Sequence, residues 1–268
     1  AGSKGVPHKN RAMVGGRPCI AWTIDAALAA ARVDHVAVST DDPAIAAIAA
    51  DRGVHPLARP PALATDTARV DDAARDAALA FERDLVANRV RPSPAGGGGV
   101  AGGSASATEG AVEQPFASGS SAPPPPTTTV VILYANVPIR PAGLIDRAIG
   151  LLESTNADSV QSYQPVGKHH PWWTARIDTD SGHVTPWEGD VLNHGVFRRQ
   201  DLPPAFIPDG AVLAVTRPAL MLELPGVPDG PHAFFGRDRR GIINAEGSVV
   251  DIDSPLDLVV ADAMLREH

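Results

Sequence analysis

The sequence predicts an α/β fold in which a mainly parallel sheet lies between two layers of helices, a three-layer, doubly wound arrangement. Two observations predict it. Short apolar runs typical of buried parallel strands alternate with alanine- and leucine-rich helical segments. The 268 residues, 44% of them hydrophobic, are also enough to bury one large core. Because such sheets bind ligands at the carboxyl ends of their strands, we expect the site in the loops that follow strands.

The elements before residue 90 are three helices and one strand. The run "HVAVST" (35–40) predicts a buried strand, and a helix over 20–32 precedes it. A helix over 43–52 follows, because Asp42 stands at the N-cap, Pro43 at the first helical position and Gly53 just past the end. Residues 70–88 predict the third helix.

The second half continues the alternation of strands and helices. "TVVILY" (129–134) predicts a buried strand, and a helix over 140–155 follows it. Further strands are expected over 157–163, 210–215 and 247–253. "SPLDLVVADAMLRE" closes the chain as an amphipathic helix, because Ser254 and Asp257 have the spacing of a capping box. Together these elements predict a single domain over 1–268.

One segment interrupts the pattern. Residues 91–129 are rich in Gly, Pro and Ser and carry almost no large apolar side chains. They cannot bury enough surface to offset the entropy of ordering, so we expect a low-complexity, disordered insertion. It is either a passive loop or a lid over the site.

Composition excludes several classes of protein. The net charge of −8 argues against nucleic acid or an anionic membrane as the main partner. Cys19 is the single cysteine, so an intramolecular disulfide is excluded, and its apolar neighbours predict a buried core residue. No stretch reaches the ~18 apolar residues of a membrane helix. No signal peptide precedes the first loop, and a cytoplasmic protein is therefore expected.

The opening stretch "AGSKGVPHKN" predicts a phosphate-binding loop. Gly2 and Gly5 allow backbone N–H groups to approach phosphate oxygens, Ser3 adds a hydroxyl, and Lys4 and Lys9 add positive charge. The spacing is not that of a P-loop. The alternative interpretation is an ordinary surface turn.

A second candidate site is the late stretch "VVDIDSPLD". On a strand, Asp251 and Asp253 would project from one face and could hold one Mg²⁺, which takes one or two carboxylates beside substrate phosphates. The alternative is a solvated strand end in which Asp253 or Ser254 caps the last helix.

Several motifs, in order along the chain, carry a resemblance to a known family. They are "GSKGVPHKN", "GGRPCIAWTIDAAL", "VSTDDPAIAAIA", "RPPALATDTA", "RRQDLPPAFIPDGAV" and "VDIDSPLDL". Together they resemble the acylneuraminate cytidylyltransferases, the CMP-sialic acid synthetases and their relatives. The resemblance implies a nucleotide-diphospho-sugar transferase-like fold. It also implies transfer of CMP from CTP to the anomeric hydroxyl of a nine-carbon keto sugar acid, with Mg²⁺ and a homodimer.

The resemblance also implies roles on the nucleotide side of the site. The opening loop would hold the CTP phosphates, with Lys9 near the α-phosphate and Asn10 near the nucleotide. Asp251 and Asp253 match the metal-binding aspartates of the family. Three residues would lie near the cytosine base: Arg59, Thr67 and Ala68.

On the sugar side, the resemblance implies that Arg199 and Gln200 border the sugar acid and that Phe234 and Phe235 pack against its acyl group. Arg140 is kept, but several positions differ from the family pattern. Tyr134 replaces a glutamine, Asn136 and Val137 replace a Thr-Ser pair, Asp209 replaces an asparagine, Leu213 a tyrosine and Trp173 a lysine. We therefore expect an acceptor other than plain N-acetylneuraminate.

The family pattern also has a strand that ends in an arginine immediately before the opening loop. This sequence begins at Ala1, within that loop. We therefore expect such a strand to precede Ala1 in the longer protein.

A segment over about 165–200 resembles the dimerisation arm of the family. Trp172, Trp173 and Trp187 gather there, and exposed aromatic clusters often mark interfaces. An ordinary local core is the alternative. His169 and His170 are adjacent, so as strand residues they would point to opposite faces, and a shared zinc ion is not expected.

Two other functions stay open. A glycosyltransferase or another sugar nucleotidyltransferase would share the fold and the paired aspartates. A degenerate, non-catalytic relative would bind a nucleotide and turn nothing over. The opening loop favours a free triphosphate, because a triphosphate needs more phosphate ligands.

Overall fold

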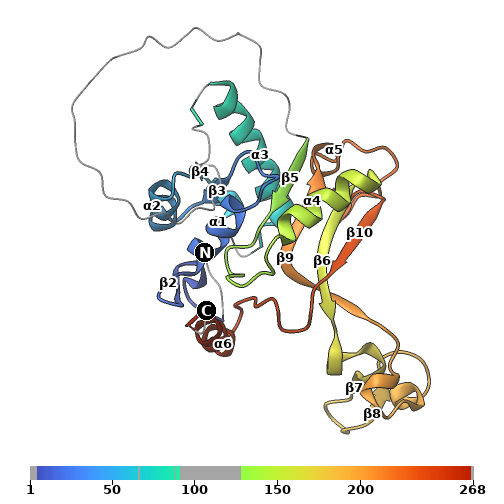
Figure 1. Ribbon diagram of the computed structural model, residues 1–268. Coiled ribbons are helices and arrows are strands. Elements are labelled where there is room, and N and C mark those ends of the chain that lie inside the picture. The colour runs from blue at the N-terminus through green and yellow to red at the C-terminus, as the bar shows by residue number, and fades with distance from the viewer. Residues whose placement is uncertain (1–4, 66, 88, 91–127, 267–268) are drawn as a thin grey trace, which may run out of the picture.

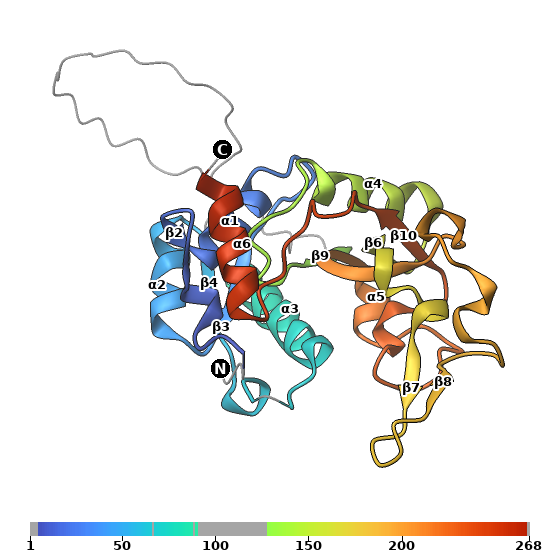
Figure 2. The ribbon, with the colours of Figure 1, turned by 90° about the horizontal axis from the view of Figure 1, so that it is seen from below.

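The structure is a computed structural model that describes residues 5–65, 67–87, 89–90 and 128–266. Most of the insertion expected over 91–129 lies outside the described residues. Within them the chain forms an α/β fold with two helical layers around a sheet, as Figures 1 and 2 show. The fold class predicted from the sequence is confirmed.

The larger sheet has four strands in the order β10-β6-β9-β5. The strands β6 and β10 pair in parallel, and β9 runs antiparallel to both β6 and β5. Three of the four strands therefore share one direction. Their bounds are β5 (Thr129–Ile132), β6 (Ser159–Pro165), β9 (Phe206–Thr216) and β10 (Arg239–Ile243).

A parallel pair, β3 (Ala37–Thr40) and β4 (His55–Ala58), lies beside the larger sheet. It packs with α1 (Cys19–Leu28) and α2 (Pro43–Asp51) around a small apolar core. The buried members of that core are Ile20, Ile24, Ile45, Ala49 and Val54. Among the described strands, β3 pairs only with β4 and β5 pairs only with β9, so no hydrogen bonds join the two sheets.

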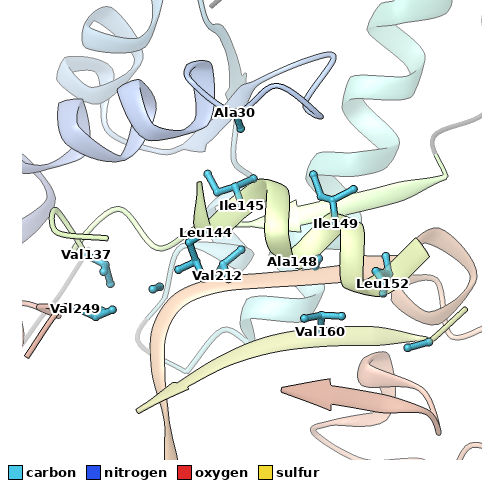
Figure 3. Packing of buried hydrophobic residues seen from close by; sticks show 13 residues of the cluster. Ala30, Val137, Leu144, Ile145, Ala148, Ile149, Leu152, Val160, Val212 and Val249 are labelled. Atoms are coloured by element: carbon cyan, nitrogen blue, oxygen red, sulfur yellow. The ribbon is translucent and has the colours of Figure 1, made fainter. Parts of the chain in front are cut away.

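Helices cover both faces of the larger sheet. On one face α4 (Leu144–Thr155) packs its apolar stripe on β6 and β9, as Figure 3 shows, because Leu144, Ala148 and Leu152 recur at helical spacing. On the other face lie α3 (Val70–Val86) and α5 (Arg217–Leu220), visible below the sheet in Figure 2. That second interface buries Leu213, Val215, Leu220 and Phe234.

The predicted helix signals are confirmed. Asp42 caps α2 by accepting a hydrogen bond from Ala44 N at 2.9 Å. The helix α6 (Pro255–Arg266) begins with a reciprocal capping box, in which Ser254 N donates to Asp257 Oδ2 at 2.7 Å and Asp257 N donates to Ser254 Oγ at 3.3 Å. The hairpin of β1 (Met13–Val14) and β2 (Arg17–Pro18) lies against α6, where Gly15 N donates to Asp262 Oδ1 at 2.8 Å. This contact joins the two ends of the described chain.

The segment between β6 and β9 projects from the body, as Figure 1 shows. It contains the hairpin of β7 (Ala175–Ile177) and β8 (Val184–Pro186) and corresponds to the arm expected over about 165–200. The remaining elements are short 3₁₀ turns at Lys9–Arg11, Pro61–Leu63, Gly167–His169, Pro171–Trp173, Leu192–Gly195, Arg199–Asp201 and Ala233–Phe235. None of the described helices has the length and apolar character needed to cross a membrane.

The expected strand over 247–253 is wrong. Val250 forms one isolated bridge with Ile139, and residues 251–253 belong to no strand. The backbone is held instead by Asn136, whose carbonyl accepts from Ile252 N at 2.9 Å. The sheet edge beside β6 is filled by β10, which begins with two arginines and lacked the apolar pattern of a buried strand. The strand β4 was also missed, because it contains Pro56.

Candidate functional site

A cavity with a volume of about 1,080 Å³ lies between the two sheets. Residues of β3 and β5 line it, together with the loops after β3 and β5 and part of the opening loop. This is the location expected for a ligand site in an open α/β sheet. Six residues predicted to bind ligand line it: Lys9, Asn10, Arg59, Ala68, Tyr134 and Asn136.

The opening loop and the late aspartates meet, although they lie at opposite ends of the sequence. Lys9 Nζ donates to Asp253 Oδ1 at 2.6 Å. A Cβ atom on Gly5 would lie 2.0 Å from the Asp253 carbonyl oxygen, so only glycine allows this approach of the two backbones. Asp253 is 71% exposed and Lys9 is 21% exposed, which leaves the carboxylate open to solvent. The structure does not describe Gly2, Ser3 and Lys4 of the same loop.

Asp251 lies half-buried beside Asp253. Asn136 Nδ2 donates to its Oδ1 atom. Burial, and after it the charge of Asp253, raises the pKa of the Asp251 carboxyl to about 6. A carboxylate that is costly to ionise gains from a nearby cation, so this pair fits a divalent metal such as Mg²⁺. No group of three or more His, Cys, Asp or Glu side chains among the described residues could hold a metal, so ligand oxygens and water would complete the shell.

Arg140 lies behind this pair and is held entirely by neutral oxygens. It donates to the carbonyl oxygens of Tyr134, Val137 and Ala211 and to Thr23 Oγ1. Burial lowers the pKa of the guanidinium to about 10, so it still carries its charge at neutral pH. Arg140 therefore fixes the loop after β5 and places a positive charge behind Asp251.

Arg59 lies at the carboxyl end of β4 and is fixed by β3. Its Nε donates to Ser39 Oγ at 3.2 Å and its Nη2 to Ser39 O at 2.7 Å. Burial lowers the pKa of Arg59, and the charges of Asp41 and Asp76 oppose this shift. Asn10 adds a buried Oδ1 atom that accepts no hydrogen bond from the described residues. Thr67 is exposed and does not line the cavity.

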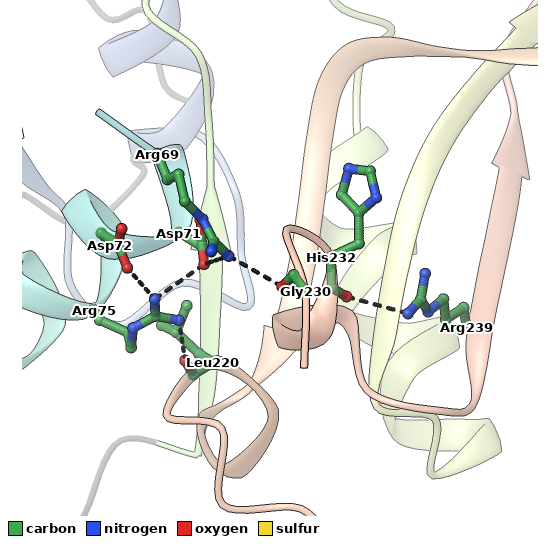
Figure 4. Close-up of polar contacts among 8 residues, drawn as sticks. All are labelled: Arg69, Asp71, Asp72, Arg75, Leu220, Gly230, His232 and Arg239. Atoms are coloured by element: carbon green, nitrogen blue, oxygen red, sulfur yellow. Dashed lines mark hydrogen bonds and ion pairs between the residues drawn. The ribbon is translucent and has the colours of Figure 1, made fainter. Parts of the chain in front are cut away.

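An ionic network fixes the start of α3, next to the loop that carries Ala68 (Figure 4). Asp71 is only 2% exposed and accepts from Arg69 Nη2 at 2.6 Å and from Arg75 Nη2 at 3.0 Å. Arg69 also donates to Gly230 O at 3.2 Å, and Arg75 donates to Leu220 O at 3.1 Å. The network therefore ties the cavity loop to the segment that follows α5.

Apart from Tyr134 and Asn136, the residues predicted on the sugar side do not line the cavity. Phe234 is buried and stacks on Phe235, with ring centroids 4.3 Å apart. Arg199 lies at the base of the arm, beside Gln200, and pairs with Glu246 at 2.5 Å. Asp209 is 5% exposed, and its carboxylate accepts from Ser162, Ala211 and Asn244.

The sequence did not predict the side chains that fix Arg140 and Arg59 in position. Thr23 accepts from Arg140, and Ser39 accepts from Arg59. Ser39 stands in "VSTDD", near the end of the strand predicted over 35–40, and that position beside a strand end was a usable signal. Thr23 lies inside a predicted helix and carried none. Cys19 is buried as predicted, and burial raises the pKa of its thiol to about 12.

Comparison with known proteins finds relatives among the cytidylyltransferases. Residues 1–90 match the family model described as cytidylyltransferase. The CMP-N,N'-diacetyllegionaminic acid synthase of Legionella pneumophila is 40% identical over 269 residues, which cover 99% of this chain and 93% of that protein. The N-acylneuraminate cytidylyltransferase of Streptococcus agalactiae serotype V is 28% identical over 261 residues, 97% of this chain. The chain spans 50% of the length of that streptococcal relative.

Solved structures share the fold at low sequence identity. A CMP:2-keto-3-deoxy-manno-octonic acid synthetase in complex with CTP superposes with a TM-score of 0.59 at 14% identity, over 99% of this chain and 95% of that one. The 4-diphosphocytidyl-2C-methyl-D-erythritol synthase of Anaerococcus prevotii gives a TM-score of 0.52 at 14% identity, over 96% and 92%. Given the near full-length match to the Legionella synthase, the chain belongs to the acylneuraminate cytidylyltransferase family.

Proposed function

We propose that this protein transfers CMP from CTP to the anomeric hydroxyl of a sialic-acid-like nine-carbon keto sugar acid and releases pyrophosphate. The observation that carries the proposal is the contact between Lys9 and Asp253 beside the large cavity. It supports the proposal because Lys9, which lines the cavity, is in contact with one of the two aspartates expected to bind a metal at the phosphates. The family supports a cytidine nucleotide, and so does the Legionella relative, whose name specifies a CMP sugar.

In this proposal the opening loop binds the phosphates. Lys9 offsets the charge that develops on the phosphoryl oxygens during displacement at the α-phosphorus, and phosphoryl transfer depends mainly on such positioning and electrostatics. Asp251 and Asp253 would hold Mg²⁺, which supplies charge neutralisation at the phosphates. Arg59 and Ala68 line the part of the cavity proposed for the base, and the unpartnered Oδ1 of Asn10 would accept a hydrogen bond from the nucleotide.

We propose an acceptor other than plain N-acetylneuraminate. The Legionella relative, at 40% identity, is a legionaminic acid synthase, whereas the streptococcal N-acylneuraminate enzyme is 28% identical. Tyr134 and Asn136, which depart from the family pattern, both line the cavity. A changed acceptor would account for changes at these two positions.

The experiment is a pyrophosphate-release assay with CTP, Mg²⁺ and a panel of keto sugar acids. The panel contains N-acetylneuraminate, N,N'-diacetyllegionaminate and 2-keto-3-deoxy-manno-octonate. We expect release with CTP that exceeds release with UTP, and the fastest turnover with an acceptor other than N-acetylneuraminate. Asp251→Asn and Asp253→Asn should abolish release, whereas Asp180→Asn, in the exposed turn between β7 and β8, should not. CTP binding without release for any acceptor would support the non-catalytic alternative.

We further propose a homodimer in which the arm packs on a second copy of the chain. The arm leaves large apolar side chains open to solvent, and Phe197 is 90% exposed. Its other exposed apolar residues are Ile177, Val184, Trp187, Val191 and Leu192. Such a patch on a projecting hairpin marks a protein interface. Sedimentation should show a dimer that Phe197→Glu weakens. A wild-type monomer at micromolar concentration would contradict the proposal.

A further inference from the structure

The strand β9 carries a large bulge next to the proposed metal site. Gln161 pairs with Leu213 and Tyr163 pairs with Pro208. A single residue of β6, Ser162, therefore faces the whole stretch 209–212 of β9. Extra residues in a strand interrupt the ladder and are common next to active sites, where they redirect side chains. The question is what holds this bulge and what it contacts.

Three buried polar side chains hold the bulge. Ser162 Oγ donates to the Asp209 carboxylate and accepts from Val212 N at 3.0 Å. Asp209 Oδ1 also accepts from Ala211 N at 3.0 Å, and Asp209 Oδ2 accepts from Asn244 Nδ2 at 2.7 Å. Ser162, Asp209 and Asn244 are all at most 5% exposed. Burying a carboxylate without a cation in hydrogen-bond contact is costly, so the donors around Asp209 are needed to keep it there.

The bulge lies against two charged side chains of the site, Asp251 and Arg140. Gly210 adopts a φ of +74°, and a Cβ atom there would lie 3.4 Å from Asp251 Oδ2 and 3.4 Å from the Tyr134 ring. The carbonyl of Ala211 accepts from Arg140 Nε at 2.7 Å. The bulge therefore forms the surface on which the Asp251 carboxylate and the Arg140 guanidinium rest.

The same network fixes the segment that carries Asp251. Asn244 N donates to Tyr163 O at 2.7 Å while its side chain donates to Asp209. Residues 245–250 then lead to Asp251 without strand pairing except the bridge at Val250. One end of this segment is tied to the bulge by Asn244, and the other end is tied to the loop after β5 by Asn136.

We propose that Ser162, Asp209 and Asn244 are positioning residues, which hold the β9 bulge against Asp251 and Arg140 and so set the geometry of the metal-binding carboxylate. None of the three lines the cavity, so they act through the residues that the bulge supports. This inference rests on the proposed function and changes the role expected for Asp209, from contact with the sugar acid to support of the site.

The experiment compares Ser162→Ala and Asp209→Ala with the control Ser159→Ala. Ser159 is a buried serine of the same strand that donates one hydrogen bond, to Phe235 O at 2.7 Å, outside the bulge. We expect Ser162→Ala and Asp209→Ala to raise the Mg²⁺ concentration for half-maximal CTP binding by about 10- to 100-fold, as loss of the partners behind metal ligands does elsewhere. Ser159→Ala should stay near wild type in this measurement.

A conservative variant separates positioning from charge. In Asp209→Asn the Oδ1 atom still accepts from Ser162 and Ala211, and the Asn244 amide can turn so that its unpartnered Oδ1 atom accepts from the new amide. We therefore expect Asp209→Asn to retain near wild-type Mg²⁺ dependence. A Mg²⁺ dependence of Ser162→Ala equal to that of Ser159→Ala would overturn the proposal, and so would a loss in Asp209→Asn as large as in Asp209→Ala.

A second measurement does not depend on CTP. Hydrogen–deuterium exchange of residues 206–216 and 245–253 should be faster in Ser162→Ala than in wild type and unchanged there in Ser159→Ala. If the wild-type protein binds no CTP, the proposed function fails, and the exchange result still decides whether the network holds these segments. Equal exchange in Ser162→Ala and wild type would contradict the positioning role. If Asp209→Ala does not fold, the Mg²⁺ dependence and hydrogen exchange of Ser162→Ala and Asp209→Asn still test the positioning role.

Discussion

Lys9 Nζ lies 2.6 Å from Asp253 Oδ1, although 244 positions separate the two residues in the sequence. The pair joins the opening loop to the segment before α6, and Gly5 permits the close approach of the two backbones. Because Asp253 is 71% exposed, the ion pair contributes little to stability, and bound phosphates and a metal would compete for both charges. We interpret the ion pair as a contact of the ligand-free site that a bound triphosphate and metal would replace.

The first prediction concerns Lys9. Lys9→Met should lower kcat/KM for CTP by about 10²- to 10³-fold, because it removes a fixed positive charge from the phosphates. The free energy of unfolding should change by at most about 1 kcal/mol, because the pair is solvent-exposed. The control is Arg266→Met, which removes the exposed pair with Asp262 at 2.7 Å, away from the cavity. An equal loss of activity in both variants would exclude a specific role for Lys9.

The second prediction concerns Asp251, whose pKa is raised to about 6. A carboxyl with a raised pKa binds its proton more tightly in the folded state, so its ionisation lowers stability as pH rises from its unfolded pKa of about 3.9 to about 6. Asp251→Asn should therefore stabilise the metal-free protein at pH 7.5. The gain should be about 1–2 kcal/mol, less than the full value of the shift because part of the carboxylate stays in water.

The same variant should lose Mg²⁺-dependent CTP binding, since the neutral amide is a poor metal ligand. In the wild-type protein this binding should weaken as pH falls through about 6, where Asp251 gains its proton. Urea unfolding and calorimetric titration with CTP and Mg²⁺ over pH 5–8 measure both effects. If Asp251→Asn were less stable than wild type at pH 7.5, the ionised Asp251 carboxylate would not destabilise the folded protein, and the prediction would be wrong.

Local signals in the sequence predicted local structure well. The cap of α2 depends on Asp42 and Ala44, and the capping box of α6 on Ser254 and Asp257, so each lies within a few residues. The aspartates show a different case. Their place beside the opening loop was expected, but the strand that was to align them does not form, because Asn136 holds that segment from 116 positions away. The sequence therefore predicted that Asp251 and Asp253 lie beside the opening loop, but not the contacts that hold their backbone there.

The supporting side chains were not predictable, because their partners are distant in the sequence. Thr23 meets Arg140 across 117 positions, and Ser162 meets Asp209 across 47. A serine within a strand looks the same in the sequence whether or not it holds a bulge. Only the register shift between β6 and β9 distinguishes Ser162, and that shift is a property of the folded sheet.

The third prediction concerns Gly5. Gly5→Ala should raise the Kd for CTP with Mg²⁺ by about tenfold or more, because the added Cβ would lie 2.0 Å from the Asp253 carbonyl oxygen and must push the loop away. The matched control is Gly150→Ala within α4, where the nearest neighbouring atom, in Arg32, is 3.9 Å from the new Cβ. That variant should bind CTP normally and gain about 0.5–1 kcal/mol from helix propensity. Normal CTP binding by Gly5→Ala would rule out the close approach of the two segments.

The fourth prediction concerns Asp71 in the network of Figure 4. Burial opposes ionisation of this carboxyl, but hydrogen bonds from Arg69 and Arg75 outweigh burial and lower its pKa. Asp71→Asn should destabilise the protein by about 3–5 kcal/mol at pH 7, because two arginines lose a buried anion. Asp72→Asn, at a carboxylate 42% exposed, should cost at most about 1 kcal/mol.

The pH dependence separates the ionic network from simple packing. A lowered folded pKa means that the stabilisation by Asp71 is complete above its unfolded pKa of about 3.9 and is lost as pH falls through the folded value. Urea unfolding of wild type and Asp71→Asn should therefore show a difference that is large at pH 7 and shrinks toward pH 2. A difference that is the same at both pH values would assign the loss to packing, because only an ionised carboxylate loses its effect when it gains a proton.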